Sequence, residues 1–287
     1  MTLTSANAFA QNPRGGAPQP SPTPQTKPTP SLESRFFRNM LRDQRAIWTS
    51  PFHVRRDDAK WIIPFGLSAA ALVATDRKTA GALDDDNDSQ PRLRISRDIS
   101  QGGALYTTGA VAATFYLVGR ATKNARARET GLLGAEALIN GEIVSNALKL
   151  ASQRPRPRVD DASGEFFDGG RSFPSGHAVN AWSMATVIAY EYGQHRPLVR
   201  FGAYGLATVV SLSRYTGRNH FLSDVLVGSA IGYGIGRYVY RTHHDPSLDA
   251  VEGETKHAEN HSKLIPVTSP LFSRASRSYG LALVWNF

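Results

Sequence analysis

The segment GLLGAEALINGEIVSNALKL, residues 131–150, is rich in alanine, leucine and glycine. Its length and composition favour an α-helix over a strand. Five other stretches share this apolar, helix-like composition: residues 61–75, 99–119, 178–190, 201–212 and 225–240. We therefore predict an all-α fold in which a bundle of about six core helices spans residues 34–242.

Both ends of the chain have a different composition. Residues 11–32 are rich in proline and have almost no large apolar side chain, so we predict a disordered tail over residues 1–33. Ala8-Phe9-Ala10 resembles a signal-peptidase site without the apolar region that should precede it. We therefore expect a signal-peptide remnant over residues 1–10 and a true start further upstream. Residues 243–287 should form a polar linker and a strand-like tail, because SYGLALVWNF alternates apolar with polar or small residues.

Two features bear on membrane contact. Residues 32–48 combine arginines with apolar residues at helical spacing, which fits either a helix on a membrane surface or one that packs Phe36, Phe37, Leu41 and Ile47 against the body. Of the apolar stretches, only residues 99–119 are uncharged and near the roughly 20 residues that a bilayer crossing needs. The mean hydropathy of −0.31 also argues against several clean spans.

The distribution of basic residues bears on membrane topology, and the family resemblance described below implies a location in the bacterial cell envelope. If the six stretches cross the membrane, the positive-inside rule puts the polar loops described below on the outer side. A cleaved signal peptide would reverse this order. We therefore predict either an inner-membrane protein with a periplasm-facing site or an exported, membrane-associated periplasmic protein.

Charge and composition limit the classes of partner and cofactor. The formal net charge of +9 suits an anionic partner, but the basic residues are spread out and no recognition motif accompanies them, so we expect no nucleic acid. The absence of cysteine excludes a thiolate zinc site and a cysteine nucleophile. Residues 84–88 resemble the opening of a calcium loop, yet its twelfth position is Ile95, so we predict no metal there. We expect His243 and His244 to be surface residues.

Three short motifs follow one another in the chain. They are Lys149-x6-Arg156-Pro157, then Pro174-Ser175-Gly176-His177, then Ser213-Arg214-x5-His220-x3-Asp224. Phosphoryl transfer spreads negative charge over three equatorial oxygens, which fixed cations stabilise. Lys149, Arg156 and Arg214 are the candidates for these cations. The neighbouring Arg154 and Arg158 remain available for further phosphate or headgroup contacts.

The second and third motifs contain the remaining candidates. Gly176 lets the backbone approach an anion at the start of a predicted helix, so its amide and the Ser175 hydroxyl are plausible oxyanion donors. His177 can protonate a leaving oxygen. Asp224 follows His220 by four residues and can accept from one imidazole nitrogen, which leaves the other free to attack phosphorus.

Two further patterns support this site. Gly228, Gly232 and Gly236 recur every four residues, which predicts close packing of their helix on a neighbour. Glu142, Asn146 and Lys149 share helical spacing, which predicts a polar face that leads to the phosphate site.

The three motifs together resemble the signature of the superfamily of type 2 phosphatidic acid phosphatases and vanadium-dependent haloperoxidases. The resemblance implies a metal-free, cofactor-free phosphatase in which His220 is the nucleophile and becomes a phosphohistidine. It implies a lipid phosphate, a pyrophosphate or a small soluble phosphate ester as substrate, and vanadate as a transition-state analogue. A vanadate-dependent haloperoxidase and a soluble non-specific acid phosphatase are the alternatives.

Overall fold

The computed structural model describes residues 32–83, 89–159, 163–194, 196–249, 267–273 and 278–284. The predictions for the Pro-rich tail up to residue 31, for the acidic loop at 84–88 and for most of the polar linker lie outside the described residues. They stay predictions.

The all-α prediction is confirmed. Eight α-helices are described: α1 Leu32–Thr49, α2 Ala59–Ala82, α3 Ser89–Ser100, α4 Leu105–Ala121, α5 Ala125–Ser152, α6 Gly176–Tyr192, α7 Pro197–Thr216 and α8 Leu222–His243. Short 3-10 turns at Ser50–His53, Arg56–Asp58 and Gln101–Gly103 connect some of them.

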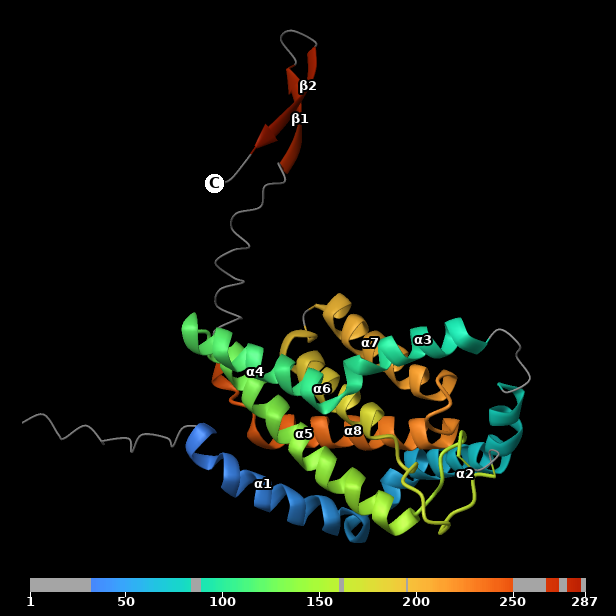
Figure 1. Ribbon diagram of the computed structural model, residues 1–287. Helices are drawn as coiled ribbons and strands as arrows, with labels where there is room; N and C mark the ends of the chain where they lie inside the picture. Colours follow the sequence, from blue (N-terminus) through green and yellow to red (C-terminus); the bar gives the residue numbers. More distant parts are fainter. Residues whose placement is uncertain are drawn as a thin grey trace, which may run out of the picture. The chain divides into compact units, whose positions relative to one another are not determined.

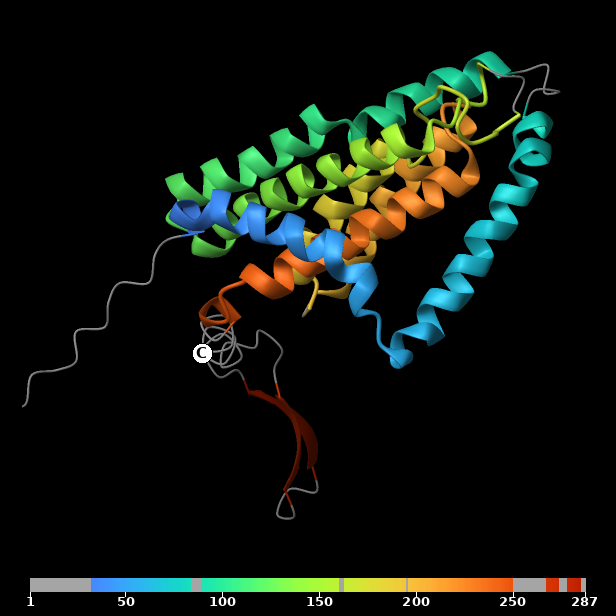
Figure 2. The same cartoon turned by 90° about the horizontal axis from the view of Figure 1, so that it is seen from below.

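Helix α6 lies at the centre of the helical region. It packs against α5, α7 and α8, whereas α4 and α1 cover α5, and α3 covers α7 (Figure 1). Its buried side chains are mostly small, such as Ala178, Ala181 and Ala185, so neighbouring helices approach it closely. Helix α2 meets the first turn of α8 near its own C-terminal end, whereas its N-terminal half diverges from the other helices (Figure 2).

The stretch predicted as one helix over residues 99–119 is two helices. Helix α3 ends at Ser100 and α4 begins at Leu105, with a 3-10 turn between them. Gly103 explains the break, because a Cβ there would lie 2.7 Å from the carbonyl oxygen of His177. The backbone of this turn therefore packs directly against the start of α6.

Among the helices that the structure describes, none has both the length and the apolar character needed to cross a membrane.

Helix α1 turns a polar face to the body of the protein. Asn39 and Asp43 are buried, whereas Phe37 and Leu41 are 74% and 71% exposed. Of the two alternatives, packing against the body is therefore wrong for Phe37 and Leu41, whereas Ile47 does pack against the hydrophobic core. The helix is held to α5 by polar contacts, such as the hydrogen bond from Gln44 Nε2 to Asn140 Oδ1 at 2.8 Å.

The C-terminal region contains two strands where the sequence predicted one. Strands β1 Val267–Ser273 and β2 Ser278–Val284 pair antiparallel, with Val267 opposite Val284. The first strand was not predicted, because VTSPLFS contains a proline and lacks clear alternation.

The predicted glycine stripe on α8 packs against α6. A Cβ at Gly232 would lie 2.3 Å from the carbonyl oxygen of Val179, and one at Gly236 would lie 2.7 Å from that of Ser183. Both neighbours are backbone atoms that cannot move aside cheaply. The stripe therefore fixes the separation of α6 and α8, whose first turns carry His177 and Asp224.

A methyl group on this stripe should destabilise the protein. We expect Gly232→Ala to cost about 1–3 kcal/mol, because the added Cβ forces the two helices apart. The matched control is Gly234→Ala on the same helix, where a Cβ would meet nothing within 4 Å. That change should be neutral or stabilise the helix by up to about 1 kcal/mol. Urea unfolding midpoints measure both, and equal effects of the two substitutions would contradict the packing argument.

Candidate active site

The three motifs meet where four helices begin or end. Lys149 lies in the last turn of α5, Gly176 and His177 begin α6, Arg214 lies in the last turn of α7, and Asp224 lies in the first turn of α8. Helix α6 begins with its backbone tied to α8, because Ser175 N donates to the carbonyl oxygen of Asp224 at 3.0 Å. Residues that are far apart in the sequence therefore share one site.

His220 is buried and its tautomer is defined by its partners. Its Nδ1 lies 2.8 Å from the backbone carbonyl oxygen of Ser172, which can only accept a hydrogen bond. Nδ1 therefore carries the proton and Nε2 carries the lone pair. Burial lowers the pKa of His220, although Asp224 opposes this effect, so the ring is neutral near pH 7.

Asp224 is linked to His220 indirectly, through a hydrogen bond with Ser172. Its Oδ2 lies 3.6 Å from His220 Nδ1, beyond a normal hydrogen bond, and accepts instead from Ser172 Oγ at 2.5 Å and Phe221 N at 3.0 Å. The predicted direct hydrogen bond from the imidazole to Asp224 is therefore wrong, because the carbonyl oxygen of Ser172 accepts in its place. Burial acts to raise the pKa of Asp224, but His220, Arg154 and Ser172 together hold that pKa below its ordinary value.

Arg154 is a buried structural residue, so its predicted availability for phosphate contact is wrong. The side chain is 1% exposed, and its Nη1 donates to Asp224 Oδ1 at 2.7 Å while its Nη2 donates to Asp76 Oδ2 at 2.9 Å. The remaining donors reach Ser223 Oγ and the Gly164 carbonyl oxygen. The guanidinium also stacks on the Phe221 ring at 4.1 Å from its centroid. Each guanidinium nitrogen thus donates to the protein, and the buried side chain does not reach the exposed phosphate or headgroup position that was predicted for it.

The three predicted cations are close enough to perturb one another. Burial lowers the pKa of Lys149, Glu142 opposes this, and Arg156, Arg171 and Arg214 lower it further. Burial together with Arg156 and Arg158 lowers the pKa of Arg214 to about 10. Each positive charge makes the charged form of its neighbours less favourable. A bound anion would offset this repulsion, so the cluster is suited to bind one.

Some hydrogen-bond donors of the motif residues have no partner among the described residues. The Ser175 hydroxyl is buried without a hydrogen-bond partner among the described residues, and it does not cap the helix. Arg214 Nε likewise has none there. A Cβ at Gly176 would lie 2.7 Å from Lys149 Nζ, so only glycine lets the ammonium group approach the first turn of α6. Together with the amides of that turn, these groups form a cradle for an anion.

His177 is neutral in this surrounding. Burial lowers its pKa to about 3, and Arg214, His220, Lys149 and Arg156 contribute in the same direction. A doubly charged phosphate group bound among these cations would raise this pKa again. The proton that His177 is predicted to donate is therefore coupled to the presence of an anion.

An open cavity adjoins the motif residues. It is lined by Pro155, Arg156, Val159, Asp168, Gly170 and Arg171. Arg156 and Arg171 are exposed, in contrast with Arg154. A second cavity, lined by apolar residues of α1, α4 and α5, contains no motif residue and takes no part in the site.

The sequence did not predict the part that four residues take in the site: Asp76, Arg154, Arg171 and Ser172. Arg154 was considered only as a possible phosphate contact. Asp76 had a weak signal, because it is a lone carboxylate next to an apolar helical stretch. Arg154 had none, since it is indistinguishable from Arg156 in RPRPR. The predicted polar face of α5 is present: Glu142 accepts hydrogen bonds from Asn146 at 3.0 Å and from Asn180 at 2.8 Å.

Comparison with known proteins gives matches over the second half of the helical region. Residues 131–247 match the sequence model of the PAP2 superfamily. The lipid A 1-phosphatase of Porphyromonas gingivalis is 35% identical over 104 residues, which cover 36% of this chain and 21% of that protein. The phosphatidylglycerophosphatase B of Bacillus subtilis is 33% identical over 109 residues, which cover 36% of this chain and 52% of that protein. The matches thus span about a fifth and about half of these relatives.

Two solved structures are similar as well. One is a transmembrane PAP2-type phosphatidylglycerolphosphate phosphatase from Bacillus subtilis, with 21% identity and a TM-score of 0.47 over 63% of this chain and 94% of that chain. The other is LpxE of Aquifex aeolicus, with 18% identity and a TM-score of 0.41 over 58% of this chain and 94% of that chain.

Arg154 and Arg156 should respond differently to the same substitution. Arg154→Met leaves the Asp76 and Asp224 carboxylates buried without their cation, and we expect a loss of about 3–5 kcal/mol in unfolding free energy. Arg156→Met changes an exposed side chain and should cost no more than about 0.5 kcal/mol. Chemical denaturation of both variants tests this, and comparable stability of the two would show that Arg154 is not the structural residue.

Proposed function

We propose that this chain is a metal-independent phosphatase in which His220 carries the phosphoryl group. The observation that carries the proposal is the hydrogen bond between His220 Nδ1 and the Ser172 carbonyl oxygen. It assigns the lone pair to Nε2, the state that a nucleophilic imidazole needs, and the surrounding cations suit a phosphate group.

The reaction proceeds in two displacements. Nε2 of His220 forms a bond to phosphorus as the bond to the leaving oxygen breaks, and His177 donates the proton that this oxygen takes up. Water then attacks the phosphohistidine, the phosphorus–nitrogen bond breaks, and a proton of the water returns to His177. Inorganic phosphate leaves, and both histidines regain their starting state.

The remaining residues stabilise the transferring group. Lys149, Arg156 and Arg214 offset the charge on its equatorial oxygens, and the Ser175 hydroxyl and Gly176 amide donate hydrogen bonds to them. Asp224 does not touch the phosphoryl group. It positions His220 through Ser172. Vanadate, which adopts the geometry of the transition state, should inhibit the reaction.

A phosphorylated lipid is the proposed substrate, and the cell envelope is the proposed location. Two observations support this choice. The related proteins from Porphyromonas gingivalis and Bacillus subtilis are named for lipid phosphates. In this chain, large apolar side chains such as Phe52, Trp61 and Phe201 are 86%, 74% and 73% exposed. Such surfaces are suited to contact with lipid.

A direct comparison of substrates tests this proposal. We expect phosphatidic acid or an isoprenyl pyrophosphate in mixed micelles to give a kcat/KM at least about tenfold above that of a soluble aryl phosphate, because the hydrocarbon chains add binding energy. His220→Gln, which keeps a polar side chain of similar reach, is the control and should abolish release of phosphate from all three. Full activity in this variant would refute the catalytic assignment, whereas equal turnover of lipid and soluble substrates would refute only the lipid preference.

Loss of His177 should depend on the leaving group. Removal of the general acid by His177→Ala should slow an alkyl phosphate by about 10²–10⁴-fold, whereas an aryl phosphate with an acidic leaving group needs little protonation and should lose less than about tenfold. Because the proton must be present on His177, wild-type kcat for the alkyl substrate should fall as pH rises through the pKa of His177 in the complex, and the variant should lack this decline. Equal losses on both substrates would show that His177 does not protonate the leaving group.

A further inference from the structure

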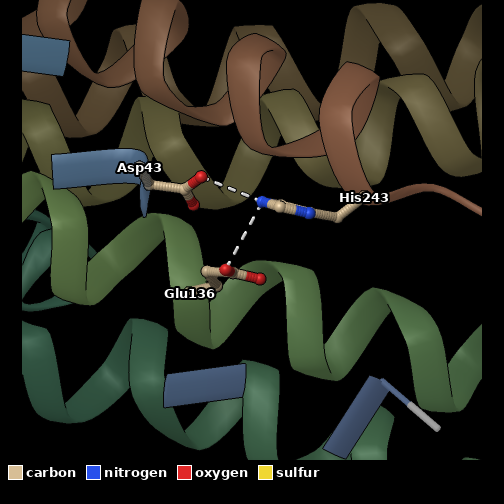
Figure 3. A group of neighbouring side chains, drawn as sticks. All are labelled: Asp43, Glu136 and His243. Carbon is tan, nitrogen blue, oxygen red and sulfur yellow. Dashed lines mark hydrogen bonds and ion pairs between the residues drawn. The ribbon is translucent and has the colours of Figure 1, made fainter. Parts of the chain in front are cut away.

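A second cluster of charged side chains lies outside the active site. Asp43 of α1, Glu136 of α5 and His243 of α8 point toward one another from three helices (Figure 3). His243 Nε2 lies 2.9 Å from Asp43 Oδ1 and 3.6 Å from Glu136 Oε1. The prediction that His243 is a surface residue is therefore wrong.

The cluster is far from the catalytic residues. Glu136 precedes Lys149 by 13 residues on α5, and His243 follows Asp224 by 19 residues on α8. At a rise of about 1.5 Å per residue, these separations correspond to roughly 20 and 30 Å along the helices. The active site therefore does not explain these side chains.

Asp43 is held in place with one oxygen directed at the histidine. Asn140 Nδ2 donates to Asp43 Oδ2 at 3.1 Å, and Gln44 Nε2 donates to Asn140 Oδ1 at 2.8 Å. Asp43 Oδ1 therefore remains for the cluster. Hydrogen bonds of this kind, which orient a carboxylate from behind, are typical of metal ligands.

One carboxylate oxygen of Glu136 is buried without a hydrogen bond. The residue is 2% exposed, and its Oε1 has no hydrogen-bond partner among the described residues although it faces His243. A buried carboxylate oxygen without a hydrogen bond is costly, and each one requires an explanation.

The spacing of the three donor atoms matches a small divalent cation. Ligands bound tetrahedrally at about 2.0–2.1 Å from zinc lie roughly 3.3 Å apart. The separations of 2.9 and 3.6 Å from His243 Nε2 bracket this value, and the three donor atoms all lie within 4.8 Å of one another. One imidazole with two carboxylates suits zinc and similar transition metals better than magnesium or calcium.

We propose that Asp43, Glu136 and His243 form a binding site for a divalent transition-metal ion of the zinc type, which ties α1 to α5 and α8. Water completes the coordination. Because the ligands come from three helices, the ion stabilises the folded chain. Its distance from the catalytic residues gives it no role in phosphoryl transfer.

A neighbouring cluster provides the contrast. Glu129, Glu191 and His244 also converge, but Arg126 Nη1 lies 4.0 Å from Glu191 Oε2 and brings a positive charge to this cluster. Both ring nitrogens of His244 face carboxylates: Nδ1 lies 3.4 Å from Glu129 Oε1 and 3.7 Å from Glu191 Oε1, and Nε2 lies 3.1 Å from Asp249 Oδ2. This cluster is therefore a buried ion-pair network, and the prediction that His244 is a surface residue is wrong as well.

Cobalt(II) is a suitable probe, because its d–d absorption reports coordination by protein ligands. The untagged full chain, stripped with a chelator, is titrated with Co²⁺ and then with competing Zn²⁺. We expect one Co²⁺ per chain, displacement by Zn²⁺, and a rise in Tm of about 5 °C or more at saturating metal. Glu136→Gln and His243→Gln should weaken binding at least about tenfold and remove the rise in Tm.

The control variant is His244→Gln, which removes the adjacent histidine and should bind Co²⁺ as the wild type does. Circular dichroism verifies that each variant is folded. If His243→Gln does not fold, the nearly isosteric Glu136→Gln decides the question. The proposal is overturned if the wild type shows no stoichiometric binding, if the variants of Glu136 and His243 bind equally well, if only His244→Gln loses the ion, or if Mg²⁺ binds in preference to Co²⁺ and Zn²⁺.

Discussion

The buried guanidinium of Arg154, shared between the carboxylates of Asp76 and Asp224, is the contact on which the rest of the site depends. It joins α2, the segment after α5 and the first turn of α8. Neither carboxylate has solvent to stabilise its charge, so each requires this cation. Through Asp224 the contact also fixes Ser172, whose carbonyl oxygen sets the tautomer of His220. A structural ion pair thus determines which nitrogen of His220 carries the lone pair, the atom to which the proposed function assigns the attack on phosphorus.

Burial divides the basic residues of this region into two groups. Arg154 is buried and paired with the carboxylates of Asp76 and Asp224, whereas Arg156, two residues later, is exposed. Lys149 and Arg214 lie between these extremes: both are largely buried and have lowered pKa values. Under the proposed function, an incoming phosphate group would offset their positive charge. Burial, together with this charge, lowers the pKa of His177 to about 3.

The sequence was sufficient to predict the helical class and the set of motif residues, because motif spacing and apolar composition are local properties. It was insufficient where tertiary contacts decide. RPRPR gives no reason to bury Arg154 and expose Arg156, since the difference depends on Asp76, 78 residues away. The break at Gly103 depends on the distant carbonyl of His177. His243 lies in a polar stretch, and its buried carboxylate partners belong to α1 and α5.

The most direct test of the account is to trap the phosphorylated enzyme. Wild-type protein is mixed rapidly with a radiolabelled phosphate ester, quenched in alkali and digested for mass spectrometry. The account predicts an acid-labile, alkali-stable phosphate on the peptide that contains His220, and its absence in His220→Gln. Phosphate on His177, or turnover without any covalent phosphoenzyme on this time scale, would contradict it.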